Sequence, residues 1–173
     1  WMLVLDGCNT KKTESTPKKY SNGVFIVNEG NFQFGNASVS FYDSATQKIE
    51  NNIFETTTGF KLGDVAQSMN TATTPDYIVL NNSQKVMAID AANDFKFLYS
   101  IQIDGSSPRH IEQINDSTAY VTELYANKIW VIDTKQKKVR KSIPVDGWTE
   151  QIFSFPQGAV AVQHPKPGTT TGS

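Results

Sequence analysis

The chain has 173 residues, of which 38% are hydrophobic and 19% charged, enough for one folded domain with an apolar core. The net charge of −1 provides no basic excess, so binding to nucleic acid or nonspecific adhesion to an anionic membrane is disfavoured. The single cysteine excludes an intrachain disulfide, and the two distant histidines lack the spacing of metal ligands. We therefore expect neither a metal site nor a cofactor.

The N-terminal residues have the features of a secretion signal followed by a tether. Residues 1–5 are apolar but too few to cross a bilayer, and the tetrapeptide Leu5-Asp6-Gly7-Cys8 resembles a bacterial lipobox, although Asp6 fits it poorly. A buried cysteine in an N-terminal strand is the alternative interpretation. The polar run that follows favours lipidation of Cys8, because its composition is that of a solvated linker. A first residue other than Met, so close to Cys8, indicates an incomplete reading frame.

Short β-forming segments recur along the rest of the chain. Three runs end in an aspartate followed by small or polar turn residues, and these aspartates are 47 and 43 positions apart. An almost continuously apolar run precedes each of them, as is typical of strands covered on both faces. The four predicted sets of strands are residues 38–43, 86–90 and 129–133; residues 23–28, 77–81, 119–122 and 159–162; residues 49–54, 97–103 and 139–145; and residues 62–69, 109–114 and 150–155.

Four short strands per unit of this length are typical of β-propeller blades. We therefore predict an all-β chain of four-stranded antiparallel blades, with about three and a half of a probable seven blades present. No segment has a convincing helical period. The expected boundaries are the end of a signal peptide at residues 1–8, a flexible tether at 9–21, a partial propeller at 22–163 and a disordered tail at 164–173.

Several segments resemble a known family. They are GVFIVNEGNF, NASVSFYD, LGDVAQSM, SSPRHIEQINDSTAYVTELYANKIWVIDTKQKKVRKSIPVDG and TEQI. Together they are similar to the YncE-like (YVTN-type) propeller lipoproteins of Bacteroidetes, over residues 23–162. This resemblance implies that the chain is an N-terminal fragment of an outer-membrane lipoprotein.

The same group of lipoproteins includes surface proteins that capture cobalamin and pass it to a TonB-dependent transporter. The resemblance implies a small-molecule nutrient as ligand and such a transporter as partner, with the lipid anchor as the only membrane attachment. Lys11 and Lys12 stand where the acidic surface-export signal of the group often lies. The cell surface and the periplasmic face therefore both stay open.

The start of the predicted innermost strands supplies the first candidate site. Aligning the repeats places Asp64, Arg109 and Glu150 at one equivalent position, where residues from separate blades ring the mouth of a central channel. These three side chains could bind a ligand together. Alternatively, Arg109 bridges the two acids and holds neighbouring blades together.

Connecting loops supply the second candidate site. Glu29, Asn31, Phe32 and Phe34 lie in a glycine-rich loop that carries more chemistry than a turn needs. The two phenylalanines could stack on a flat ligand, although packing under the loop is the commoner outcome. Two further aromatic residues in connections, Tyr125 and Trp148, suit contact surfaces.

Three classes of function remain compatible with these residues. The first is a non-catalytic binding module in the envelope, which the absence of GxSxG, P-loop and dinucleotide-binding motifs favours. The second is a propeller enzyme of lactonase or quinoprotein type, in which Asp64, Glu123 and Glu150 could hold calcium although Arg109 would repel it. The third is an adhesion or protein-interaction scaffold.

Overall fold

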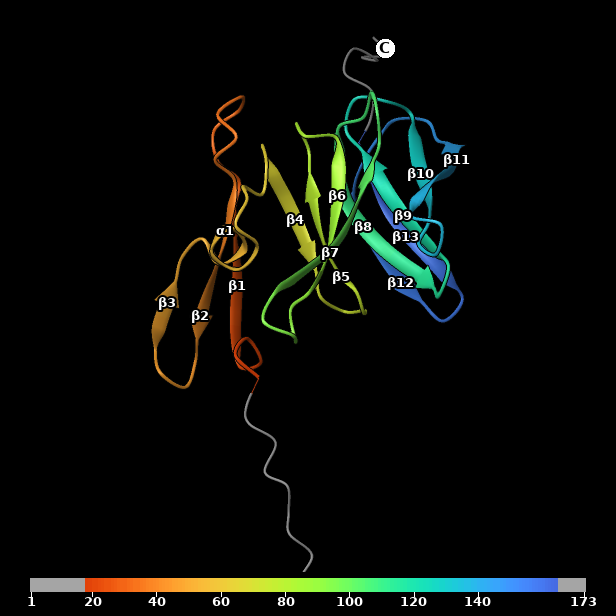
Figure 1. The fold of residues 1–173 in the computed structure, drawn as a ribbon. Helices are drawn as coiled ribbons and strands as arrows, with labels where there is room; N and C mark the ends of the chain where they lie inside the picture. The colour runs from red at the N-terminus through yellow and green to blue at the C-terminus, as the bar shows by residue number, and fades with distance from the viewer. Residues whose placement is uncertain (1–17, 165–173) are drawn as a thin grey trace, which may run out of the picture.

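The computed structural model describes residues 18–164, which fold into successive antiparallel sheets (Figure 1). The strands are β1 (Gly23–Asn28), β2 (Ser38–Asp43), β3 (Lys48–Glu50), β4 (Ala66–Asn70), β5 (Asp76–Leu80), β6 (Lys85–Asp90), β7 (Lys96–Gln102), β8 (Pro108–Asn115), β9 (Thr118–Glu123), β10 (Lys128–Asp133), β11 (Lys138–Pro144), β12 (Trp148–Phe155) and β13 (Gly158–His164), with one short helix, α1 (Ile53–Thr58). The predicted all-β class is confirmed.

Each sheet is a meander in which consecutive strands are neighbours. Strands β4 to β7 form one four-stranded sheet and β8 to β11 form another, both in chain order. Before them lies the three-stranded sheet β1-β2-β3, and after them the two-stranded sheet β12-β13. The inner strand β8 packs beside β4 on one side and β12 on the other. This succession of four-stranded units confirms a propeller-like architecture.

The middle strands of each unit are buried because both of their faces are covered. Residues 77–80 of β5 and 86–89 of β6 are buried without interruption, as their continuous apolar sequences predict. The outer strand β7 alternates between exposed residues and residues that are half-buried or, at Ile101, buried. In the β4–β7 sheet the middle strands are therefore the most completely buried, and the outer strand buries one face only.

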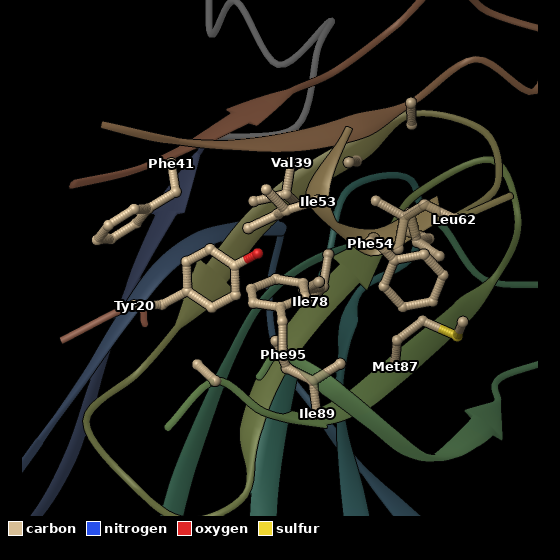
Figure 2. Close-up of a cluster of buried hydrophobic side chains, with 14 residues drawn as sticks. Tyr20, Val39, Phe41, Ile53, Phe54, Leu62, Ile78, Met87, Ile89 and Phe95 are labelled. Atoms are coloured by element: carbon tan, nitrogen blue, oxygen red, sulfur yellow. The ribbon is translucent and has the colours of Figure 1, made fainter. Parts of the chain in front are cut away.

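Two hydrophobic cores lie between neighbouring sheets. The first joins the β1–β3 sheet to the β4–β7 sheet and includes Phe41, Phe54 and Phe95 (Figure 2). The second joins the β4–β7 sheet to the β8–β11 sheet through residues such as Tyr77 and Ile132. Because side chains from adjacent sheets share each core, a single sheet has no core of its own.

The aromatic part of the first core extends beyond the predicted boundary of the propeller. Tyr20, which the sequence assigns to the tether, is only 5% exposed, and its ring lies 5.2 Å from that of Phe41. Beside it, Lys19 forms an ion pair with Glu50 at 2.9 Å. The packed structure therefore begins before residue 22. At the other end, His164, assigned to the tail, is the last residue of β13.

The strand predicted for residues 49–54 is wrong beyond Glu50. Asn52 adopts a left-handed conformation (φ 56°) that ends the extended chain, and α1 begins at Ile53. The helix buries Ile53 and Phe54 and contacts both β2 and β7. Its β-branched residues favour a strand locally, so packing between two sheets overrides propensity here. No helix within residues 18–164 is long and apolar enough to cross a membrane.

Candidate ligand-binding rim

One end of the sheets collects the starts of the inner strands and the loops between the middle strands. Three backbone hydrogen bonds join these parts: Ala66 donates to Glu29, Asn81 to Val65, and Leu124 to Ser107. We call this end the upper rim, because it lies at the top of Figure 1. Both predicted candidate sites face this rim.

Arg109 connects three inner strands at the upper rim. Its Nε donates to Glu150 Oε2 of β12 at 2.8 Å, and its Nη1 donates to Gln67 Oε1 of β4 at 2.5 Å. The side chains of Arg109 and Glu150 are 20% and 18% exposed, so the pair is only partly accessible to water. The structure brings Arg109 and Glu150 together, and Gln67 contributes the third polar group.

A β-bulge explains why these three residues are equivalent. The register of β4, β8 and β12 shifts just after Ala66, Pro108 and Thr149, respectively. The residues that follow these three positions are those of the Arg109 cluster. An extra residue at a bulge is re-aimed away from the regular alternation, which places it toward the neighbouring inner strand.

Asp64 lies outside the Arg109 cluster, contrary to the predicted alignment. Its Oδ2 accepts hydrogen bonds from Gln33 N at 2.8 Å and from Asn82 Nδ2 at 2.5 Å, so it joins two loops of the upper rim. Val65 has φ 55°, and this left-handed residue turns the chain before β4 begins at Ala66. The alignment was wrong because it treated Asp64 as part of the strand. The buried Oδ1 of Asp64 has no protein partner.

A second set of side-chain hydrogen bonds joins the same inner strands farther from the rim. Asn70 Nδ2 donates to Glu112 Oε2 at 2.8 Å, and Ser154 Oγ donates to Glu112 Oε1. Beside them lies a hollow of about 310 Å³ lined in part by His110 and Phe153. Burial lowers the pKa of His110, and the neighbouring Arg109 acts in the same direction while Glu150 opposes it. The inner strands are therefore linked by side chains.

The loop between β1 and β2 presents its aromatic residues to solvent. Phe32 is 62% exposed and Phe34 is 72% exposed, so the expectation that they pack under the loop is wrong. Hydrogen bonds from Asn31 N to Asn36 Oδ1 (2.8 Å) and from Phe34 N to Asn31 O (3.0 Å) hold the loop in this shape. Glu29 and Asn31 are exposed as well.

A third exposed aromatic residue lies at the same rim, on the β9–β10 connection. Tyr125 is 66% exposed, and its ring meets that of Trp148 edge to face, with centroids 5.3 Å apart. Trp148 is half-buried and opens β12. The pair therefore links the β8–β11 sheet to the β12–β13 sheet. Tyrosine and tryptophan suit such a contact because each combines a large apolar ring with a polar group.

Glu123 is a structural residue that sequence reasoning did not assign correctly. It is 1% exposed, and its carboxylate accepts hydrogen bonds from Ser107 N and Trp130 Nε1, both at 2.8 Å. Its backbone N–H donates to Thr149 Oγ1 of the next sheet. The available signal was a lone acid that closes an otherwise uncharged strand.

The three carboxylates considered as calcium ligands occupy separate hydrogen-bond networks. Asp64 bonds to rim loops, Glu123 to Trp130 and Glu150 to Arg109. Within residues 18–164, no group of three or more histidine, cysteine, aspartate or glutamate residues could hold a metal ion. Cys8 lies outside the described residues, as do most of the predicted tether and residues 165–173 of the predicted tail.

Comparisons with a family model and with solved structures support the propeller-like fold. Residues 22–124 match the family model described as "Domain of unknown function (DUF5074)". Among solved structures, a chain of hydrazine synthase from Kuenenia stuttgartiensis superimposes with a TM-score of 0.63 at 23% identity, covering 87% of this chain and 40% of that one. At this identity the likeness shows a shared propeller-like fold alone, and the chain spans well under half of the length of its match. No curated protein sequence matches the chain.

Proposed function

The chain belongs to the DUF5074 domain family, and we propose that it is a non-catalytic binding module whose upper rim holds a small molecule or docks a partner. The observation that carries the proposal is the Arg109 cluster, which gathers polar groups from three separate sheets at one place. Such a convergence of a few fixed hydrogen-bonding groups is typical of ligand sites. Its members are partly accessible, so a ligand could exchange with the present partners.

The exposed aromatic rings of the same rim support a flat or extended ligand. Phe32, Phe34 and Tyr125 are each more than half exposed, so most of each ring is available for contact with a ligand. Aromatic faces stack on planar groups, whereas the guanidinium of Arg109 suits amide or carboxylate oxygens. A ligand that combines planar rings with peripheral amides, as a cobalamin-like molecule does, would satisfy both.

The proposed setting is the bacterial envelope. The lipobox-like tetrapeptide that ends at Cys8 and the polar run after it support an outer-membrane lipoprotein, at the cell surface or on the periplasmic face. The resemblance to YncE-like propeller lipoproteins of Bacteroidetes supports nutrient capture, with a TonB-dependent transporter as the partner. In that role the chain binds the nutrient and hands it on without chemical change.

Ligand binding is tested by thermal-shift and calorimetric titration of the chain with cobalamin, haem and short glycans. A ligand at a hundred times its Kd stabilises the folded state by about 2.7 kcal/mol, which gives a clear shift in Tm. Phe34→Ser and Arg109→Gln are expected to weaken binding by about tenfold or more, since each removes a contact of roughly 1–3 kcal/mol.

Ile49→Ser is the matched control for Phe34→Ser. Ile49 is 57% exposed but lies on β3, away from the upper rim, so the control variant should keep full affinity. Equal loss in the control and the rim variants would assign the effect to general stability. If none of the three ligand classes shifts the Tm, the small-molecule part of the proposal fails, and capture of a transporter by the immobilised chain becomes the decisive measurement.

A further inference from the structure

Positive charge is concentrated on the outer edge of the β8–β11 sheet, which is the third sheet in chain order. Strand β11 and the turn before it carry Lys135, Lys137, Lys138, Arg140 and Lys141, and all five side chains are exposed. We call these five residues the basic strip. The whole chain has a net charge of −1, so the strip is a local excess that the overall charge conceals. β11 is the outermost strand of its sheet.

A β-bulge increases the density of charge along this edge. Val131 pairs with Lys141 and the next residue, Ile132, pairs with Val139, which leaves Arg140 as the extra residue of β11. Val139 packs against the second core, while Arg140 and Lys141 are both exposed. The bulge therefore places two consecutive cations in solvent, where regular alternation would turn one of them inward.

The outer strand β7 of the β4–β7 sheet is equivalent to β11. It shows that a sheet edge can be protected from pairing with another chain without five cations. Lys96 pairs with Asp90 as Lys138 pairs with Asp133, so β7 and β11 have matching positions. In β7 the bulge residue is Leu98 instead of an arginine. A sheet edge is shielded from unwanted pairing by one or two charged residues, and β7 manages with one lysine.

Among the described residues, no cation of the basic strip forms an ion pair. The two ion pairs found among residues 18–164 involve Lys19 and Arg109, and neither belongs to the strip. Asp133, which precedes the turn, uses its Oδ1 to accept a hydrogen bond from Gln136 N. Lys137 lies over the ring of Tyr99 at 4.5 Å, a contact that retains its positive charge.

We propose that the basic strip docks the protein onto an anionic phospholipid bilayer, with the outer edge of the third sheet facing the headgroups. The three cations of β11 lie within about 10 Å of edge strand at 3.3 Å per residue, and the other two lie in the turn before it, so the charge is spread over several headgroups. A single phosphate would need a concave nest of donors instead. The expectation that the chain does not adhere to anionic membranes treated its charge as uniform, whereas the fold separates the charges.

This inference goes beyond the proposed function. It concerns the outer edge of the sheet, far from the Arg109 cluster in the hydrogen-bonded order of the strands, and it requires neither the rim ligand nor a lipid on Cys8. With an anchor present, the strip would orient the molecule on the membrane and leave the upper rim free.

The test is co-sedimentation of the unlipidated chain with vesicles of phosphatidylcholine alone and of phosphatidylcholine mixed with phosphatidylglycerol. The chain should bind the mixed vesicles only, and high salt should abolish binding. The quadruple variant Lys135→Gln, Lys138→Gln, Arg140→Gln, Lys141→Gln should partition at least about a hundredfold more weakly, because each cation near an anionic surface contributes roughly fivefold. Lys137 is retained because it contacts Tyr99.

The matched control removes the same total charge from elsewhere. Its substitutions are Lys18→Gln, Lys48→Gln, Lys61→Gln and Lys96→Gln, all at exposed positions outside the strip. The control should bind mixed vesicles nearly as well as the unaltered chain. Equal loss in both quadruple variants would overturn the proposal, because total charge would then account for binding. No binding of the unaltered chain to mixed vesicles would overturn it too.

Two further measurements separate the alternatives. If duplex DNA competes with mixed vesicles at equal phosphate concentration, the strip is a general polyanion site and the membrane assignment is wrong. If the quadruple variant self-associates in size-exclusion chromatography, the charges serve edge protection instead. The single variant Arg140→Glu, placed at the bulge, covers the case in which the quadruple variant does not fold. It should weaken vesicle binding by more than fivefold, and an unchanged partition would count against the strip.

Discussion

The buried carboxylate of Glu123 is expected to be among the most important polar groups for stability. It joins the end of β9 to Ser107 before β8 and to Trp130 on β10, with both hydrogen bonds at 2.8 Å. Hydrogen bonds to a charged group contribute about 1.5–3 kcal/mol each. In Glu123→Gln one oxygen is replaced by an NH2 group that would face an N–H donor. The free energy of unfolding of the variant should therefore be lower by about 2–3 kcal/mol, because one hydrogen bond is lost and one buried N–H donor is left unpaired.

The assay for Glu123→Gln is urea unfolding followed by tryptophan fluorescence, with the slope of unfolding free energy against urea compared between variants. An unchanged slope with a lower midpoint is expected. Glu29→Gln is the matched control, because Glu29 is an exposed acid at the same rim and the variant should change stability by under about 0.5 kcal/mol. A cycle with Trp130→Phe should give a coupling of about 1 kcal/mol. If Glu123→Gln is as stable as the control, the carboxylate does not support the fold as argued.

Three more outcomes follow from the same contacts. A double-mutant cycle of Arg109→Gln and Glu150→Gln, measured by urea unfolding, should give a coupling energy near 1 kcal/mol, because the two side chains are only about one-fifth exposed. A coupling energy of zero would mean that the ion pair does not hold β8 to β12. Gly63→Ala should lower the free energy of unfolding by about 2 kcal/mol or more, since the backbone at this position has φ 139° and the new Cβ would lie 2.7 Å from Ser83 Oγ. An unchanged Tm would refute this clash. Burial lowers the pKa of His110 in the folded chain, so the unfolded chain binds more protons and stability should fall as the pH drops below about 6.5. The variant His110→Gln should flatten this part of the plot of Tm against pH. An equally steep plot for the variant would contradict the assignment to His110.

Strand order and sheet type could be predicted because they depend on local patterns that repeat. The apolar run at residues 77–80 and the turn after Asp90 indicate a buried strand and a hairpin regardless of the rest of the chain. Because the same pattern recurs after Asp43 and Asp133, the repeats identified the four-stranded unit. Asp43 and Asp133 each accept backbone hydrogen bonds within their turns, as the sequence predicts.

Side-chain placement at the rim could be predicted only in part. Arg109 and Glu150 meet as expected, but the third partner is Gln67, three residues after the aspartate that the alignment chose. A left-handed residue at Val65 and a bulge in β4 set that shift, and neither has a sequence signature as strong as glycine or proline. The exposure of Phe32 and Phe34 also depends on how the loop is held by its own asparagines.

The sequence alone determined the all-β class, the repeating unit and the positions of most strands, because hydrophobic periodicity and turn residues act within a few positions. Tertiary structure alone decided that residues 53–58 form a helix, that Gln67 joins Arg109 and that the run of cations at residues 135–141 lies at an exposed sheet edge. The partners in the Arg109 cluster are 41 and 42 positions apart in the chain. Contacts at that distance depend on how whole sheets pack against one another, and no local pattern of residues contains that information.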